Sequence, residues 1–211
     1  METKVAEAKN QATEARLKLL QTQIEPHMLF NTLANLRALI PSNPGAAVQM
    51  LDQMNDYLRA TLNASRATHH PLQAEFDRLR DYLALMAVRM GPRLRFILDL
   101  PSALANVDVP TLLLQPIVEN SIKHGLEPQL GGGDVTVRAR QNGSFLTLEV
   151  LDTGVGLRTS QSGTSDGGFG LAQVRERLLT AYGDSATIQI AANEPTGTRV
   201  TITYPSPALK T

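Results

Sequence analysis

An apolar repeat with alternating steps of three and four residues runs through the first 40 residues and constrains the fold most. Its members are Val5, Ala8, Ala12, Ala15, Leu19, Thr22, Pro26, Leu29, Leu33, Leu36 and Ile40. A seam sustained over about five heptads is typical of a helix that packs along another helix. The pattern therefore predicts one helix over residues 3–40.

A second helix is predicted over about residues 46–66, after a turn of breaker residues at 41–45. Val48, Leu51, Leu58 and Leu62 share one stripe of this helix. Two antiparallel helices with a short connection form a hairpin. Because a hairpin alone buries little apolar surface, we expect a second copy of the chain to complete a four-helix bundle, and hence a homodimer.

His27 is the first candidate for chemistry, and it directly follows a proline in the middle of the predicted helix. Pro26 lacks an N–H and clashes with the carbonyl of Thr22, so it is costly there. With Pro26 at heptad position a, His27 and Asn31 fall at b and f, one turn apart and facing away from the seam. Two interpretations stay open on these residues: a reactive imidazole displayed on a kinked helix, or a surface histidine beside an accidental kink.

Charge and composition exclude several classes of partner and site. The 20 basic and 20 acidic residues cancel, which gives no electrostatic reason to expect nucleic acid or an anionic membrane surface as a partner. The absence of cysteine excludes disulfides and thiolate metal sites. No apolar run approaches the roughly 18 residues of a membrane span, and the chain does not open on a signal segment. We expect a cytoplasmic location.

The pattern changes at Leu72 and predicts an α+β sandwich, a mixed or antiparallel sheet with helices on one face. His69-His70-Pro71 before it is interpreted as a polar linker and not as a metal site. Residues 153–168, rich in Gly, Ser and Thr, are interpreted as a mobile loop. Helices are predicted over residues 72–90, 111–125 and 169–182, and strands over 94–100, 135–140, 145–151, 186–192 and 198–204.

Polar residues in the predicted helix 111–125 form the first of three clusters that could bind a ligand. Glu119, Asn120, Lys123 and His124 follow one another along one edge of that helix. The edge offers an acid, an amide oxygen and two donor or cationic groups. Such a set could hold a metal ion and phosphates together.

Two glycine-containing clusters follow. Asp152 stands at the end of a predicted strand, and Gly154 and Gly156 come directly after it. A carboxylate at this place can accept from an exocyclic amine, and glycines let the backbone approach a flat ring. Gly168 and Gly170 open the helix 169–182, where backbone N–H groups and the helix dipole favour phosphate.

These motifs, in this order, resemble those of LytS/YehU-type sensor histidine kinases over about residues 15 to 205. The histidine box is similar to residues 23–33, the asparagine box to 114–125, the two glycine boxes to 152–156 and 168–171, and two further matches cover 175–178 and 197–198. Two positions depart from the usual histidine box: Glu25 stands where Asn is usual, and Met28 stands where Phe is usual. Which group orients the imidazole of His27 is therefore open.

The resemblance implies two domains: a dimerisation and histidine phosphotransfer hairpin over 1–68, and a GHKL-type (Bergerat) ATP-binding domain over 71–206. It implies ATP and Mg²⁺ as cofactors and His27 as the phosphoacceptor. By the same resemblance Asn120 holds Mg²⁺ that bridges the ATP phosphates, Asp152 receives the adenine amino group, and Thr198 supports that contact through water. Glu119, Lys123 and His124 would lie near the phosphates, and Gly154, Gly156, Gly168 and Gly170 would shape the nucleotide pocket and its lid.

The implied activity is autophosphorylation of His27, followed by transfer of the phosphoryl group to an aspartate of a response regulator. Asn31 would orient a water for the reverse reaction, and Pro26 would loosen the helix where the ATP-binding domain docks. A membrane would be reached only through a segment that is not present in this chain. The alternative function is a non-catalytic, nucleotide-binding dimeric signalling module. A chaperone-type or mismatch-repair ATPase would lack the hairpin with His27, and an anti-sigma serine kinase would lack the histidine box.

Overall fold

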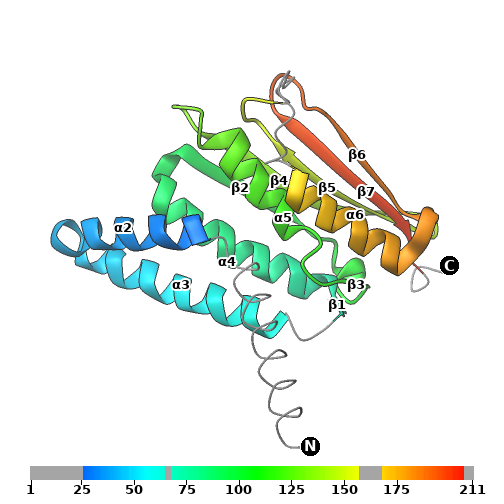
Figure 1. Ribbon diagram of the computed structural model, residues 1–211, viewed down its shortest axis with the longest axis horizontal. Helices are drawn as coiled ribbons and strands as arrows, with labels where there is room; N and C mark the ends of the chain where they lie inside the picture. Colours follow the sequence, from blue (N-terminus) through cyan, green and yellow to red (C-terminus); the bar gives the residue numbers. More distant parts are fainter. Residues whose placement is uncertain (1–25, 65–67, 157–167, 207–211) are drawn as a thin grey trace, which may run out of the picture. The chain divides into compact units, whose positions relative to one another are not determined.

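The computed structural model describes residues 26–64, 68–156 and 168–206, which fall into two compact units, Met1–Arg66 and Ala67–Thr211. The first unit holds the helices α2 (Pro26–Ser42) and α3 (Pro44–Ala64) (Figure 1). The predicted hairpin is thus confirmed, and the part of the first helix predicted over residues 3–25 lies outside the described residues. None of the helices within the described ranges is long and apolar enough to cross a membrane.

The connection between α2 and α3 is shorter than predicted, because Pro41 and Ser42 continue the first helix and Asn43 alone separates the two. The side-chain oxygen of Asn43 accepts from the amide of Ala46 at 3.1 Å. This is the contact of a helix N-cap, and Pro44 occupies the first helical position, where its missing N–H costs nothing. A single capping residue therefore starts α3 without a longer turn.

The predicted stripe of α3 is not its buried face in the single chain. Val48 and Leu51 are 60% and 41% exposed. Among the described side chains of α3, those of Ala47, Met50, Met54 and Tyr57 are buried instead. The helix therefore carries two apolar stripes, one buried and one exposed.

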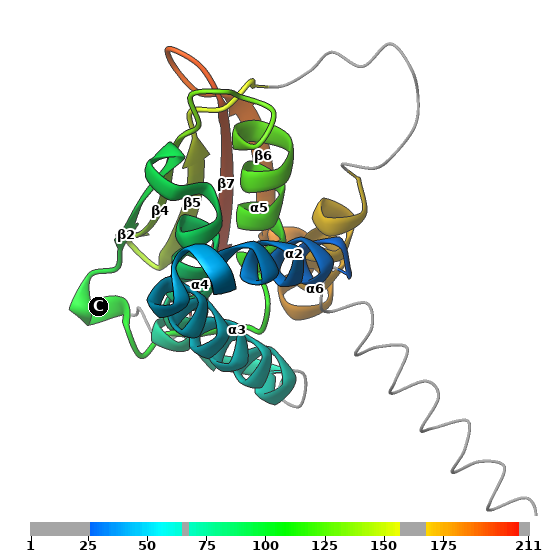
Figure 2. The ribbon, with the colours of Figure 1, turned by 90° about the vertical axis from the view of Figure 1, so that its left-hand side faces the viewer.

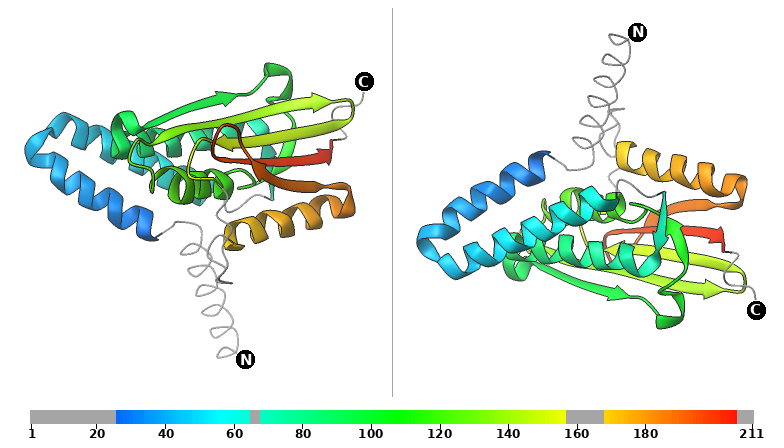
Figure 3. Two further views of the ribbon diagram at one scale, coloured as in Figure 1. Left: turned by 90° about the horizontal axis from the view of Figure 1, so that it is seen from above. Right: turned by 90° about the horizontal axis from the view of Figure 1, so that it is seen from below.

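The second unit is built on a five-stranded sheet with the order β2-β4-β5-β7-β6. β2 runs parallel to β4 and the other neighbours are antiparallel, so the sheet is mixed. Helices of this unit cover one face of the sheet (Figures 2 and 3), which confirms the predicted α+β class. The strands are β2 (Leu94–Asp99), β4 (Gly133–Asn142), β5 (Phe145–Asp152), β6 (Thr187–Ala192) and β7 (Thr198–Pro205), and the helices are α4 (Leu72–Met90), α5 (Gln115–Asn120) and α6 (Gly168–Tyr182).

Burial alternates along the central strands, as expected for a sheet with one covered face. In β4 the side chains of Val135, Val137 and Ala139 are fully buried. In β5 Leu146, Leu148 and Val150 are buried in the same way, so period-two patterning fixes which face meets the helices. The strands end next to the candidate site, since β5 closes on Asp152 and β7 begins at Thr198.

Two predicted segments of this unit are wrong. Residues 111–114 form a turn and not the start of a helix; α5 begins at Gln115 and continues as the π-helix η3 (Ser121–Leu126). His69–Pro71 is not a linker but the strand β1, which pairs antiparallel with β3 (Asp108–Pro110). The partner of β1 lies about 40 residues along the chain, where no local pattern could show it. Short 3₁₀ turns complete the unit: η1 (Gly91–Arg93), η2 (Ser102–Leu104) and η4 (Gly183–Ser185).

Candidate nucleotide-binding site

Asp152, the last residue of β5, is a buried carboxylate held in a fixed orientation, with 2% of its surface exposed. Its Oδ1 accepts from the backbone amide of Gly154 at 2.9 Å and from that of Thr198 at 3.2 Å. Burial raises the pKa of Asp152, and these two amides together with the hydroxyl of Ser121 offset only part of that rise. The fold thus keeps an acceptor in an apolar setting, where a hydrogen bond from a ligand is strong.

Three glycines let separate stretches of backbone converge on Asp152. A Cβ added to Gly154 would lie 2.3–2.5 Å from backbone atoms of Gly125, and one added to Gly197 would lie 1.9 Å from the carbonyl oxygen of Asp152. Gly197 also has a φ of +108°, which only glycine adopts easily. Gly125 belongs to η3, and its own Cβ would stand 3.0 Å from Oδ1 of Asp152. No larger residue fits at Gly154 or Gly197 without moving the backbone.

Replacement of Gly154 by alanine is expected to lower the free energy of unfolding of the second unit by about 1–3 kcal/mol, because the new methyl group overlaps the Gly125 backbone. Urea denaturation followed by circular dichroism measures the change. Gly131→Ala is the matched control, since a Cβ there has nothing within 4 Å. Equal stability of the two variants would contradict the close approach.

The predicted phosphate-side residues meet where α5 ends and α6 begins. Asn120 closes α5, and a Cβ on Gly170 would lie 3.4 Å from Nδ2 of Asn120. Glu119, one residue earlier, accepts from the side-chain amide of Gln115 at 2.8 Å. Lys123 and His124 lie on η3 and are exposed. The first turn of α6 therefore packs directly on the residue predicted to face the metal and phosphates.

The two groups of residues are joined by one continuous helical segment. Asn120 is followed directly by Ser121, whose hydroxyl bonds Asp152, and five residues later by Gly125, whose carbonyl accepts from the amide of Val155 at 3.0 Å. Gly156 adjoins the same cluster, with a φ of +75° and its Cβ position 3.4 Å from the carbonyl oxygen of Gly197. A π-helical turn at such a point is a frequent mark of functional sites.

The structure describes only the backbone at three predicted positions. Gly168 is the first residue of α6, and the loop before it, residues 157–167, lies outside the described residues. His27 and Asn31 both belong to α2 in the first unit, one turn apart along the helix, and their side chains are not among those described. The predicted roles of these residues stay predictions.

Three residues of the site had no sequence signal of their own. Ser121 and Gly125 lie inside the asparagine box but carry no ligand chemistry that would single them out. Asn193, in the turn between β6 and β7, donates from its amide to the carbonyl oxygen of Asp152 at 2.9 Å. It lies 41 positions from its partner, so only the three-dimensional structure brings the two together.

Comparisons with known proteins agree with this geometry. The family model described as "Histidine kinase" matches residues 15–94, and the model "Histidine kinase-, DNA gyrase B-, and HSP90-like ATPase" matches residues 106–208. The histidine kinase domain of the blue-light activated histidine kinase EL346 from Erythrobacter litoralis has the same fold. It superposes with a TM-score of 0.52 at 20% identity, over 93% of this chain and 94% of that one.

Curated relatives are similar along nearly the whole chain. Sensor histidine kinase BtsS of Escherichia coli is 34% identical over 193 residues, and sensor protein LytS of Bacillus subtilis is 28% identical over 209 residues. The matches cover 92% and 93% of this chain but 34% and 35% of the relatives, so the chain spans about a third of their length. With its helical part and its ATPase part matched in the same order, this chain belongs to the family of sensor histidine kinases with a GHKL-type ATPase domain.

Proposed function

We propose that this chain is the kinase part of a two-component sensor: it transfers the γ-phosphoryl group of ATP to His27 and passes it on to an aspartate of a response regulator. The observation that carries the proposal is the buried carboxylate of Asp152, fixed by two backbone amides at the end of a sheet strand. The helix that bears His27 precedes this ATPase unit along the chain. We also propose residues 1–68 as the dimerisation and phosphotransfer domain and residues 71–206 as the catalytic domain.

Asp152 is the proposed adenine-recognition group. Oδ1 accepts from the amides of Gly154 and Thr198, which fixes the plane of the carboxylate, and a carboxylate has acceptor sites beyond those that its three protein partners use, so it can also accept from the exocyclic amine. Thr198 is held beside it by its own backbone bond, which supports the predicted water-mediated role of its side chain. Gly154 and Gly156 keep the neighbouring backbone close to the ring.

Asn120 is the proposed ligand of Mg²⁺. Among the described residues no group of three or more His, Asp or Glu side chains could hold a metal ion by itself. That fits an ion that arrives with its substrate, because Mg²⁺ is usually bound by one or two protein oxygens together with phosphate oxygens and waters. When bound, it offsets the negative charge that builds up on the phosphates. Lys123 and His124 add positive charge or hydrogen-bond donors. The backbone amides of Gly168 and Gly170, in the first turn of α6, can donate hydrogen bonds to the phosphates.

His27 is the proposed nucleophile. A neutral imidazole is abundant near pH 7 because its ordinary pKa is about 6.5. One ring nitrogen forms the new P–N bond in line with the P–O bond to ADP, which breaks, and the imidazole proton is released. Glu119, next to Asn120 in the chain, is also a proposed catalytic residue. Asn31 is the proposed group that orients a water for dephosphorylation of the regulator.

Incubation with γ-labelled ATP, followed by an acid-lability test, examines the proposal. Phosphohistidine loses its label in acid, whereas a phosphoserine, the product of an anti-sigma-type kinase, keeps it. A chain that binds ATP but takes up no label would support the alternative, a nucleotide-binding signalling module without catalysis. Transfer of the label from the purified phosphorylated chain to a receiver domain tests the second half of the reaction.

The exposed stripe of the first unit supports the proposed homodimer. Leu33 and Ile40 of α2 are 43% and 58% exposed, and Val48 and Leu51 of α3 are 60% and 41% exposed. Leu33 and Ile40 belong to the heptad seam, so the residues expected to meet another helix are those that the single chain leaves uncovered. A second copy of the same hairpin would cover both stripes in a four-helix bundle.

A double substitution of Ile40 and Val48 by aspartate is expected to turn the dimer into a monomer, because both carboxylates would be buried in the bundle without a partner. Sedimentation equilibrium gives the mass directly. Gln49→Asp adds one carboxylate at an exposed neighbouring position of α3 and is expected to leave the dimer intact. A dimer that survives the double substitution would place the interface elsewhere.

A further inference from the structure

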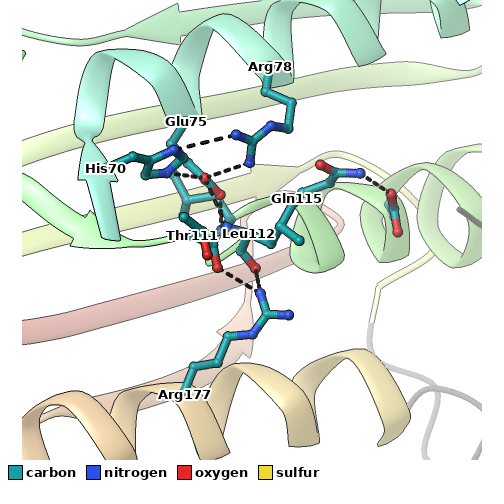
Figure 4. A network of polar contacts seen from close by, with 9 residues as sticks. His70, Glu75, Arg78, Thr111, Leu112, Gln115 and Arg177 are labelled. Carbon is teal, nitrogen blue, oxygen red and sulfur yellow. Dashed lines mark hydrogen bonds and ion pairs between the residues drawn. The ribbon is translucent and has the colours of Figure 1, made fainter. Parts of the chain in front are cut away.

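A buried polar network lies under the start of α5, and the proposed reaction does not use it directly (Figure 4). At its centre is Glu75, in the first turn of α4, with 1% of its side chain exposed. Oε1 of Glu75 accepts from the amide of Leu114 at 2.8 Å, and Oε2 accepts from the amide of Leu112 at 3.2 Å. Both amides belong to the turn that leads into α5.

Two side chains keep this carboxylate charged. Nε2 of His70, on β1, lies 2.8 Å from Oε2 of Glu75, and Nη1 of Arg78 lies 3.4 Å from the same oxygen. Burial alone would raise the pKa of Glu75, but the His70 hydrogen bond, the Arg78 charge and the Leu114 amide outweigh it and lower the pKa. Nδ1 of His70 lies 3.4 Å from Nη2 of Arg78, and because a guanidinium nitrogen can only donate, Nδ1 is the acceptor in this contact.

The turn that Glu75 holds contains a strained residue. Leu112 has a φ of +57°, in the left-handed region that a bulky residue avoids. Such a conformation persists only where its surroundings impose it. Here the amide of Leu112 is fixed by Glu75, and its carbonyl oxygen accepts from Nη1 of Arg177 at 2.5 Å.

Arg177 brings α6 into the same network. Its Nη1 also donates to the carbonyl oxygen of Thr111 at 2.8 Å, so one guanidinium nitrogen holds two successive carbonyls of the turn. Burial lowers the pKa of Arg177, and the charge of Glu75 offsets part of that change. The turn is therefore held from both sides, by the carboxylate of Glu75 from α4 and by the guanidinium of Arg177 from α6.

The residues proposed for the phosphates stand at the far ends of the two helices that meet on this turn. α5 has six residues, Gln115–Asn120, so it carries Glu119 and Asn120 only about 9 Å from the held amide of Leu114. α6 carries Gly170 in its first turn, two turns before Arg177, and Gly170 packs on Asn120. A short helix fixed at its base transmits any shift of the base to its tip.

We propose that Glu75 and Arg177 are positioning residues: by holding the strained turn at Leu112 from opposite sides, they set where α5 presents Glu119 and Asn120 against the start of α6. The inference rests on the proposed kinase function. It assigns a role to Arg177, which lies in the motif at residues 175–178, for which the resemblance implies no role. It also assigns a role to Glu75, which lies outside all of the motifs.

The test compares Glu75→Gln and Arg177→Met with the wild-type chain. In Glu75→Gln the new amide group faces a backbone N–H, so one of the two bonds to the turn is lost. Phosphorylation of His27 at saturating ATP is expected to slow by about tenfold to a hundredfold, the range for a displacement of the order of 1 Å at a reacting centre. The affinity for adenosine, measured by calorimetry, is expected to fall much less than the rate, because the amides of Gly154 and Thr198 hold Asp152 from outside α5.

Arg177→Lys keeps the charge and one donor nitrogen, and it is expected to recover part of the rate lost in Arg177→Met. Asp77→Asn is the matched control: it removes a half-exposed carboxylate from the same helix as Glu75 and should phosphorylate like the wild type. Thermal unfolding of each variant separates misplacement from loss of the fold, and if Glu75→Gln does not fold, the Arg177 pair carries the test.

The possible results are distinct. Wild-type rates in Glu75→Gln and Arg177→Met overturn the positioning role and leave the proposed function standing. Equal losses of adenosine affinity and phosphorylation also overturn it, since they indicate a general structural role. A wild-type chain that takes up no label overturns both proposals.

Discussion

Replacement of His27 by glutamine is expected to reduce acid-labile labelling from γ-labelled ATP to background, because the substitution removes the proposed nucleophile and leaves a side chain that cannot accept a phosphoryl group. Its helix, α2, should form as before, since glutamine is a good helix former. ATP affinity should not change, because no residue of the Asp152 cluster is altered. Autoradiography before and after acid treatment, with calorimetry for ATP, measures both quantities.

His69→Gln is the control for this experiment. His69 is exposed, and the described contact of its ring is with the hydroxyl of Thr68, so its replacement removes an imidazole without touching the proposed chemistry. Full labelling of the His69 variant and none of the His27 variant is the expected pair of results. Undiminished labelling of His27→Gln would place the phosphoacceptor on another residue.

Replacement of Asp152 by asparagine is expected to weaken ATP binding about tenfold to a hundredfold, the range for losing a hydrogen bond to a charged group. The asparagine oxygen can still accept from the amides of Gly154 and Thr198, so the local backbone should persist. Its NH₂ group would then stand where the carboxylate oxygen faces the adenine amine, donor against donor. Calorimetric titration with ATP measures the loss, and Asp184→Asn, at an exposed position, is the control.

The same variant should be at least as stable as the wild type at neutral pH. Burial raises the pKa of Asp152 above the ordinary 3.8, so the charged carboxylate costs folding free energy once the pH exceeds both values. Asparagine carries no such cost. As the pH falls through the raised pKa towards 3.8, the wild-type carboxyl becomes neutral and the advantage of asparagine should disappear. Thermal unfolding across that range checks the sign, and a variant that is less stable at every pH would contradict it.

Local periodicity was enough to predict most elements of the second unit. The helix predicted over residues 72–90 has the same bounds as α4, and the predicted strands correspond to β2, β4, β5, β6 and β7 within two residues at each end. These elements each present one apolar face to a common core, so their own sequence contains the information.

The errors fall where distant residues decide the backbone. Residues 111–114 have the composition of a helix, but Glu75, 37 and 39 positions away from the two amides it binds, holds them in a turn. A leucine at positive φ gives no signal in the sequence, since leucine does not favour that conformation. His69–Pro71 likewise becomes a strand only through its pairing with β3.

The candidate site divides in the same way. Asp152 could be predicted because it ends an alternating strand and precedes two glycines, a local pattern. The parts played by Gly125 and Asn193 could not, because they depend on contacts with Asp152 across 27 and 41 positions of chain. Asn120 and Gly170 were each found from their own motif, but their mutual packing follows only from the way α6 lies on α5.

The continuous segment from Asn120 to Gly125 has a consequence for how the proposed nucleotide binds. It contacts α6 at its first residue and Asp152 through Ser121 and Gly125, so it fixes the span between the adenine end and the phosphate end of the site. A ligand whose two ends match that span binds as a chelate: once one end is seated, the other is at a high effective concentration. Adenosine and triphosphate added as separate molecules are therefore expected to bind far more weakly than ATP, although the two molecules together can make the same contacts with the protein.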